Sequence, residues 1–240
     1  MELNYKKSDT IVISDIHIGS KNSKTDKLYD FLDLLLENPP KRLIVAGDLF
    51  ELWSTSYKKI GKYDHKVIRK ILELSQNKIE IIYIPGNHDR AFRAFRKFTL
   101  GNIDIKREYL IRHNGKKYIV MHGDEFDAFT RNHVILSLII DQLYIVIIKW
   151  SAFVKRFFGL RMSLSSRKKS KRYLKIVKKI KKAALTYARS VKVDGIIIGH
   201  THYPEIFKNI DGIVYANSGD WIDSLSYIVI SDDIKLQYFK

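Results

Sequence analysis

The sequence predicts an α/β fold in which buried, largely parallel strands are covered by helices. Short runs rich in Ile and Val recur along the chain, and each ends in a polar cluster, which is the pattern of a strand buried on both faces. Apolar residues at helical spacing lie between several of these runs. Because alternating strands and helices are typical of parallel connections, we expect a mixed sheet, or two packed sheets, with helices outside.

The expected elements follow one another in a regular order. The first strands cover residues 10–14, 43–46, 79–85, 118–121 and 195–198. Beyond Tyr203 the pattern changes, and residues 212–216, 226–230 and 234–239 are expected to be strands joined by tight turns. A helix is predicted from Leu28 to Leu35, with Thr25 as its N-cap. A second helix is predicted over residues 64–77, where apolar residues repeat at helical spacing.

Length and composition predict one compact domain over residues 1–240, with an inserted subdomain. The hydrophobic fraction is 45% and the charged fraction 29%, an ordinary globular balance. The chain contains no cysteine, so disulfides and thiolate metal sites are excluded, and any metal must be bound by oxygen and imidazole nitrogen. Residues 1–9 lack the apolar core of a signal peptide, which leads us to expect a cytoplasmic protein.

The net charge of +17 is concentrated in one segment. Residues 142–193 contain 16 Lys and Arg and no acidic residue, so the rest of the chain is close to neutral. A concentrated basic segment predicts an anionic partner, which could be lipid headgroups, nucleic acid or a phosphorylated substrate.

Five successive strand ends carry side chains that bind metals. In open α/β sheets ligands bind beyond the carboxyl ends of strands, so these side chains converge if the strands are neighbours. The candidate metal ligands are Asp15, His17, Asp48, Asn87, His122, His200 and His202. Seven oxygen and nitrogen ligands suit two cations that share a bridging carboxylate, whereas a structural zinc site uses about four ligands, commonly including cysteine.

Paired cations explain why these residue types occur together. Two cations about 3.5–4 Å apart clamp a phosphate, generate hydroxide from water and offset charge on the leaving oxygen. Carboxylates with imidazoles suit Mn, the metal we expect here, and also Fe or Zn. Glycines beside the ligands let the backbone turn sharply.

As a set, these motifs closely resemble the signature series of calcineurin-like metallophosphoesterases, in matching order from about residue 10 to residue 220. The resemblance implies a four-layer α/β/β/α sandwich. It implies one cation held by Asp15, His17, Asp48 and His202, and a second held by Asp48, Asn87, His122 and His200. It also implies that His88, oriented by Asp89, donates a proton or stabilises charge at the leaving group, with Asn87 and His88 contacting substrate.

A narrower resemblance concerns the residues that flank these motifs. Gly47-Asp-Leu-Phe-Glu51-x-Trp53, His122-Gly-Asp-Glu-Phe-Asp127 and Gly219-Asp-Trp221 resemble the branch that contains UDP-2,3-diacylglucosamine diphosphatases. Those enzymes hydrolyse the pyrophosphate of an acylated sugar nucleotide in lipid A synthesis, and some carry Arg at the position of His88. The resemblance implies a helical cap over the metals within residues 128–193, with acyl chains between cap and body. It places Ser165, Lys169 and Arg172 among the substrate contacts.

The insert contains two distinctive segments. Residues 134–148 are almost wholly apolar, but Asp141 and Gln142 interrupt them. A helix of that length spans only about 22 Å, less than the roughly 30 Å of a bilayer core, so we expect burial, an acyl-channel wall or an interfacial helix. Residues 173–187 predict an amphipathic helix rich in lysine. This helix could lie on an anionic membrane, pack as a lid with its lysines in water, or bind nucleic acid.

The leading hypothesis is therefore a metal-dependent pyrophosphohydrolase that acts on an acylated UDP-sugar and associates peripherally with the inner membrane. The first alternative is a nuclease or nucleotide phosphodiesterase of the same superfamily, in which the basic segment grips a phosphate backbone. The second is a non-catalytic binding scaffold. The sequence makes no prediction about oligomeric state.

Overall fold

The computed structural model describes residues 3–7, 9–52, 61–95, 99–100, 102–127 and 171–240, without the side chains of Leu100 and Arg172. The apolar segment 134–148, and Ser165 and Lys169 with it, lie outside the described residues, as does most of the expected cap. Arg172 lies in a described helix, but its side chain is among those not described. None of the helices in the described part of the chain has the length and apolar character that a membrane crossing requires.

Two sheets form the centre of the molecule. The first has the strand order β12-β11-β1-β2-β3-β5-β4, and the second the order β6-β7-β8-β10-β9. The first sheet contains β1 (Thr10–Ile13), β2 (Arg42–Val45), β3 (Glu80–Tyr83), β4 (Thr99–Leu100), β5 (Ile103–Ile105), β11 (Ser226–Ile230) and β12 (Ile234–Tyr238). The second contains β6 (Glu108–His113), β7 (Lys116–Met121), β8 (Gly195–Ile198), β9 (Glu205–Lys208) and β10 (Val214–Asn217). The central strands β1, β2 and β3 run parallel, as do β7, β8 and β10.

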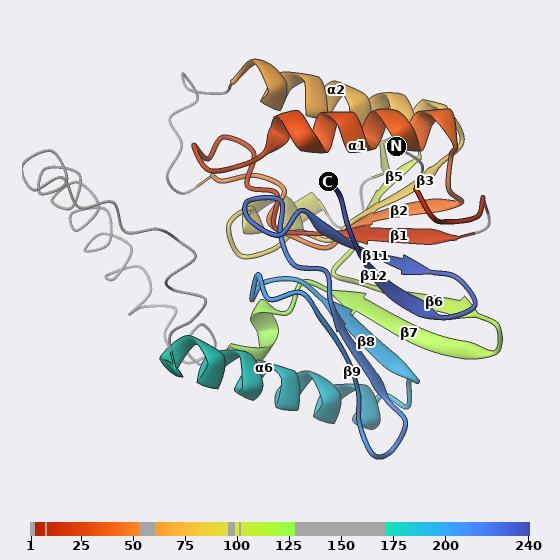
Figure 1. Cartoon of the computed structure of the whole chain (residues 1–240), viewed down its shortest axis with the longest axis vertical. Coiled ribbons are helices and arrows are strands. Elements are labelled where there is room, and N and C mark those ends of the chain that lie inside the picture. Colours follow the sequence, from red (N-terminus) through yellow and green to blue (C-terminus); the bar gives the residue numbers. More distant parts are fainter. Residues whose placement is uncertain (1–2, 8, 53–60, 96–98, 101, 128–170) are drawn as a thin grey trace, which may run out of the picture.

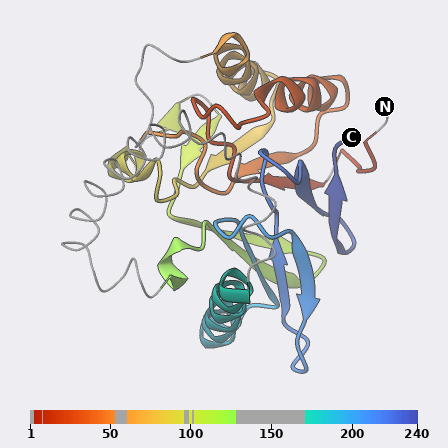
Figure 2. The ribbon, with the colours of Figure 1, turned by 60° about the vertical axis from the view of Figure 1, so that its left-hand side comes forward.

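Helices cover the outer face of each sheet, which gives four layers (Figure 1). Helices α1 (Thr25–Glu37) and α2 (Lys62–Gln76) lie side by side over the first sheet, and α6 (Lys171–Ser190) covers the second. A view turned by 60° shows the same arrangement, with α6 under the second sheet (Figure 2). Two short 3₁₀ helices, η2 (Arg90–Phe95) and η3 (Asp124–Phe126), follow β3 and β7. The predicted α/β/β/α sandwich is confirmed for the described residues.

Alternating side chains of each central strand fill different cores. Ile11 and Ile13 of β1 pack with α1 and α2, whereas Val12 between them packs against the second sheet. In the same way Ile196 and Ile198 of β8 contact α6, and Ile197 faces the first sheet. Because both faces of these strands are buried, the sequence shows continuous apolar runs rather than alternation.

Several local predictions were wrong or incomplete. Thr25 is the first residue of α1 rather than its N-cap; the residue before it, Lys24, makes no side-chain capping bond. The sequence also did not predict β4, β5, β6 or β9. Strand β9 lies at a sheet edge with three of its four residues exposed, so its sequence lacks the apolar run that reveals a buried strand.

Candidate functional site

The loops that carry the seven candidate ligands meet on one side of the two sheets. Strands β1, β2 and β3 of the first sheet, and β7 and β8 of the second, each end just before one of the predicted motifs. Hydrogen bonds join the loops across the sheets. The backbone N–H of His200 donates to Oδ2 of Asp15 at 2.9 Å, and Nδ1 of His122 donates to the carbonyl of Ala46 at 2.9 Å. The structure therefore brings together residues separated by nearly the whole chain.

One group of ligand atoms comes from the loops after β1 and β8. Asp15, His17 and His202 each present an atom within 4.8 Å of the others. Nε2 of His202 lies 3.3 Å from Oδ1 of Asp15, and the rings of His17 and His202 stack with centroids 5.3 Å apart. Nδ1 of His202 faces Oδ2 of Asp220 at 3.3 Å. A carboxylate against the outer nitrogen is typical of an imidazole that binds a metal through its other nitrogen.

Asp48 lies between this group and the remaining ligands. Its Oδ2 is 3.8 Å from Nε2 of His17 and 3.4 Å from Nε2 of His122. The same nitrogen of His122 lies 3.1 Å from Oδ1 of Asn87. The ring of His200 contacts that of His122, with centroids 5.1 Å apart. Asp48 therefore belongs to two of the groups whose atoms could hold a metal ion.

The donor atoms fit divalent cations. Asp15 and Asp48 are 0% and 2% exposed, and a buried carboxylate requires a compensating charge. Oδ1 of Asp15 and Nε2 of His17 are buried without a hydrogen-bond partner among the residues that the structure describes. Because buried polar atoms are nearly always paired, two such atoms in one cluster indicate a ligand that bonds to both.

Burial and neighbouring charge shift the pKa values within this cluster. Burial disfavours the charged form of Asp48, but His122, His88 and His17 outweigh it and hold the Asp48 pKa below its usual range. Burial alone would lower the pKa of His122, yet Asp48 and the surrounding carboxylates raise it well above the usual value. The pKa of His202 is raised against burial by Asp15 and Asp220. Without cations, protons therefore balance the buried carboxylates.

Unusual backbone conformations shape the ligand loops. Five of the candidate ligands have φ between 53° and 63°, in the left-handed region that residues other than glycine seldom occupy, although Asn, Asp and His do so more often than most. They are Asp15, His17, Asp48, His200 and His202. The expectation that neighbouring glycines permit sharp turns holds for Gly47, with φ of 96°. Gly86 and Gly199 instead provide space, since a Cβ there would lie 2.2 Å from Asp48 Oδ1 and 2.4 Å from Asp15 Oδ2.

His88 lies at the rim of the cluster, but its carboxylate partner differs from the expected one. The structure places Nδ1 of His88 3.0 Å from Oε1 of Glu51. Asp89 is directed elsewhere: its Oδ1 accepts from the Gly86 N–H at 2.6 Å, and its Oδ2 accepts from the Tyr83 hydroxyl at 2.6 Å. The prediction that Asp89 orients the His88 ring is therefore corrected. Asp89 secures the loop after β3, because its carboxylate accepts from the backbone N–H groups of Gly86 and Phe50 and from the Tyr83 hydroxyl.

Sequence reasoning assigned no role to Glu51, Asp220 or Asp127. Oδ2 of Asp127 lies 3.7 Å from Nε2 of His200. Burial raises the Glu51 pKa, but hydrogen bonds to His17 and His88 outweigh this and lower it to about 2. All three residues lie within the motifs that resemble the UDP-2,3-diacylglucosamine diphosphatase branch. Their place in those motifs was the one feature of the sequence that could have indicated a functional role.

A cavity of about 300 Å³ opens beside His200 and His202. Its walls include the apolar side chains of Ile176, Val177, Ile180 and Ile222. Tyr173 closes one side, with its hydroxyl donating to the carbonyl of Thr201. The candidate metal ligands therefore border an apolar space on helix α6.

The outer face of α6 forms a second charged region, which we call the cationic face. It consists of the exposed residues Lys171, Lys175, Lys178, Lys179, Lys182 and Arg189. The apolar stripe of the helix is buried against the second sheet through Ile180, Ala184 and Ala188, and Val177 is buried as well. Most of that stripe is therefore packed on the body of the protein, although Ile176 is 44% exposed. The arrangement is that of a helix packed on the sandwich with its lysines in water, and contact with a membrane or with nucleic acid stays a prediction.

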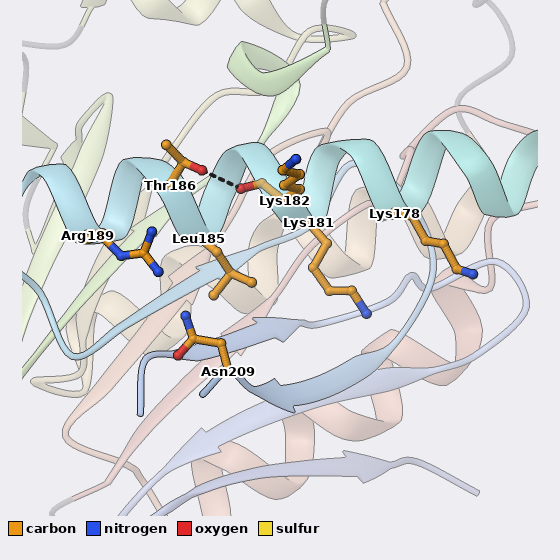
Figure 3. A pocket seen from close by; sticks show the side chains of 7 residues that line it. All are labelled: Lys178, Lys181, Lys182, Leu185, Thr186, Arg189 and Asn209. Carbon is orange, nitrogen blue, oxygen red and sulfur yellow. Dashed lines mark hydrogen bonds between the residues drawn. The ribbon is translucent and has the colours of Figure 1, made fainter. Parts of the chain in front are cut away.

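A pocket of about 440 Å³ borders the cationic face (Figure 3). Lys181, Leu185 and Arg189 extend from α6 toward the turn that carries Asn209. Lys181 is paired with Glu205 at 2.7 Å and Arg189 with Asp211. Lys178 and Lys182 also line the pocket, and neither forms an ion pair with a residue in the described part of the chain.

Comparison with known proteins agrees with this arrangement. The family model for calcineurin-like phosphoesterases matches residues 9–204. The UDP-2,3-diacylglucosamine hydrolase of Blochmanniella pennsylvanica is 30% identical and aligns over 82% of this chain and 80% of its own length. Proteins of the same name from Psychromonas ingrahamii and Escherichia coli are 24% and 25% identical, covering 93% and 96% of this chain and 94% and 98% of their own lengths. The chain is accordingly a hydrolase of phosphoric ester or anhydride bonds, and it belongs to the calcineurin-like phosphoesterase family.

Proposed function

We propose that the protein hydrolyses the pyrophosphate of an acylated UDP-sugar with two divalent cations, most readily Mn. The observation that carries the proposal is the position of the candidate ligands beside an apolar cavity. Such a site suits a substrate with a diphosphate at one end and acyl chains at the other. The names of the relatives, which align over most of their own lengths, support the same substrate class.

In this proposal Asp15, His17, Asp48 and His202 hold one cation, and Asp48, Asn87, His122 and His200 hold the other. Cations bound there supply Lewis-acid activation of water and charge neutralisation at the phosphate. The protein itself fixes the geometry. Asp220 and the Ala46 carbonyl hold the outer nitrogens of His202 and His122, so each ring can present only Nε2 to the site.

Asn87 and His88 are the proposed contacts to the phosphate, with His88 near the leaving group. The backbone N–H of His88 donates to Oδ1 of Asp48 at 2.9 Å, which ties its loop to the carboxylate proposed to bridge the cations. From this position the ring can donate a proton to the departing oxygen or stabilise its charge. Ser165, Lys169 and Arg172 are still predicted to contact the substrate.

Peripheral association with an anionic bilayer is part of the proposal. The cationic face carries no acidic residue, and clustered Lys and Arg bind anionic lipid by charge alone. Because the apolar stripe of α6 is buried, this binding is electrostatic and weakens as salt rises. The N-terminal half of α6 lines the cavity, so a bilayer on the cationic face would lie near the cavity proposed to hold the acyl chains.

The test compares substrates on the Mn-loaded protein. UDP-2,3-diacylglucosamine should release UMP with a kcat/KM at least about 10²-fold above that of the corresponding sugar nucleotide without acyl chains, because only the acylated form fills the apolar cavity. Bis-p-nitrophenyl phosphate, cyclic nucleotides and single-stranded DNA complete the panel. Preferred cleavage of DNA, with steep salt dependence, would overturn the proposal in favour of the nuclease alternative.

A further inference from the structure

One buried carboxylate contacts two histidines with different proposed tasks. Oε2 of Glu51 lies 3.2 Å from Nδ1 of His17 and 2.9 Å from Nδ1 of His88, which is also 3.0 Å from Oε1. Glu51 is only 8% exposed, so water competes little for either contact. The two rings meet edge to face with centroids 4.8 Å apart. A single side chain therefore links a proposed metal ligand to the proposed leaving-group donor.

The backbone holds Glu51 in this position. The loops after β1 and β2 run alongside each other, with a parallel bridge between Ile18 and Phe50. The N–H of Glu51 donates to the Ile18 carbonyl at 3.0 Å, and the N–H of His17 donates to the Asp48 carbonyl at 2.9 Å. Because both loops are fixed, the Glu51 carboxylate has little freedom to leave the rings.

The contact determines which nitrogen of each ring carries a proton. A carboxylate accepts hydrogen bonds, so each Nδ1 facing Glu51 must be the protonated nitrogen. In His17 this leaves Nε2 as the lone-pair atom, and Nε2 is the nitrogen that is buried without a hydrogen-bond partner among the described residues. In His88 the anchored Nδ1 fixes the ring and directs Nε2 away from Glu51.

We propose that Glu51 is a positioning residue that aligns His17 for metal binding and His88 for the leaving group at the same time. The inference rests on the proposed function for the roles of the two histidines. The alternative is that Glu51 only joins two loops. In that case its loss would lower stability without changing metal affinity or leaving-group preference.

The first experiment needs neither metal nor substrate. Long-range ¹H–¹⁵N spectra of the metal-free chain report which nitrogen of each imidazole is protonated, and we expect Nδ1–H for both His17 and His88. In Glu51→Leu both rings lose their acceptor, so at least one of the two signals should move to the other tautomer. Unchanged tautomers in Glu51→Leu would overturn the proposal, whatever the activity of the protein.

The second experiment measures Mn binding and hydrolysis of two phosphodiesters, one with a p-nitrophenyl and one with an alkyl leaving group. Glu51→Gln should weaken Mn binding about 10–100-fold. It should also lower kcat for the alkyl substrate about 10²-fold more than for p-nitrophenyl, which needs little protonation. Glu73→Gln, at an exposed glutamate paired with Lys70, is the matched control and should leave both quantities unchanged.

Two further variants separate the outcomes. Glu51→Asp keeps the charge but is one methylene too short to reach both rings. It should therefore alter either Mn affinity or leaving-group preference, but not both. His88→Ala combined with Glu51→Gln should show no further change in leaving-group preference, because both act through one contact. Equal losses on both substrates, with wild-type Mn affinity, would make Glu51 a loop contact only. If the wild-type protein shows no Mn-dependent hydrolysis, the proposed function fails, while the tautomer result still stands or falls by itself.

Discussion

The two most highly charged regions of the molecule are organised in opposite ways. At the candidate metal cluster, carboxylates such as Asp15 and Asp48 are almost fully buried and accept hydrogen bonds from backbone N–H groups. On the cationic face, lysines extend into solvent from a helix whose other side is buried. At the metal cluster, the function of each charge depends on where its atoms lie. On the cationic face, only the total positive charge matters. Single substitutions should therefore disable the first region and only weaken the second.

The largest effect is expected at the carboxylate proposed to bridge the cations. Asp48→Ala should lower kcat/KM about 10³-fold or more, because both cation sites lose a ligand. Circular dichroism should show an unchanged fold, since three buried cores hold the sandwich. Asp232→Ala, at an exposed carboxylate paired with Lys6, is the control. Wild-type-like activity of Asp48→Ala would refute the metal scheme.

Removal of metal should have an effect of similar size that is reversible. Treatment with EDTA should abolish hydrolysis, and added Mn should restore it. Mn should also raise the melting temperature, because it binds only the folded protein. Activity that is indifferent to chelation at matched pH would contradict the proposal.

The buried glycines test how tightly the ligand loops are packed. Gly199→Ala should destabilise the protein by about 1–3 kcal/mol and weaken Mn binding, since the new methyl group meets Asp15 and Ser14 within about 2.4 Å. Denaturant unfolding measures the first quantity and Mn titration the second. Gly61→Ala is the control, because its nearest neighbour would be at 3.4 Å. If Gly199→Ala and Gly61→Ala changed stability and Mn binding equally, the ligand loops would be able to move aside for the added methyl group.

The raised pKa values of His122 and His202 predict a pH effect on metal binding. A raised pKa means that the metal-free protein holds more protons near neutral pH, and a cation must displace them. Mn affinity should therefore fall as pH falls, by about tenfold per pH unit for each proton displaced. Titration calorimetry in buffers of different ionisation enthalpy should detect proton release. Binding without proton release would indicate that these rings are not ligands.

The smallest single effects are expected on the cationic face. Lys182→Gln should weaken binding to anionic vesicles about fivefold, and replacement of Lys175, Lys178 and Lys182 together about 10²-fold, because each exposed lysine contributes about 1 kcal/mol. Hydrolysis of a water-soluble substrate should not change. Lys116→Gln, an exposed lysine in β7, is the control. Vesicle binding unaffected by the triple variant would remove the cationic face from the proposal.

The sequence predicted the buried strands well, and the structure places the candidate ligands at the ends of those strands, for a common physical reason. Strands such as β8 are buried on both faces and need continuous apolar runs, and metal ligands need particular side chains. Strand β6 was missed because Ile111 is its only buried residue. The contacts of Glu51 were also missed, since they depend on how two loops align after the sheet has formed. Sequence patterns indicate which strands are buried and which side chains can bind metal. They do not indicate which carboxylate accepts a hydrogen bond from a given histidine ring.

The left-handed backbone at five of the seven candidate ligands has a consequence for evolution and design. Each such residue lowers the stability of the chain by about 1 kcal/mol relative to glycine. Replacing His200 by glycine should therefore relax the metal-free protein even as it removes a ligand. A screen for thermal stability alone, run without divalent ions, would select sequences that have lost these ligands. At these five positions the requirements of metal binding therefore oppose those of folding.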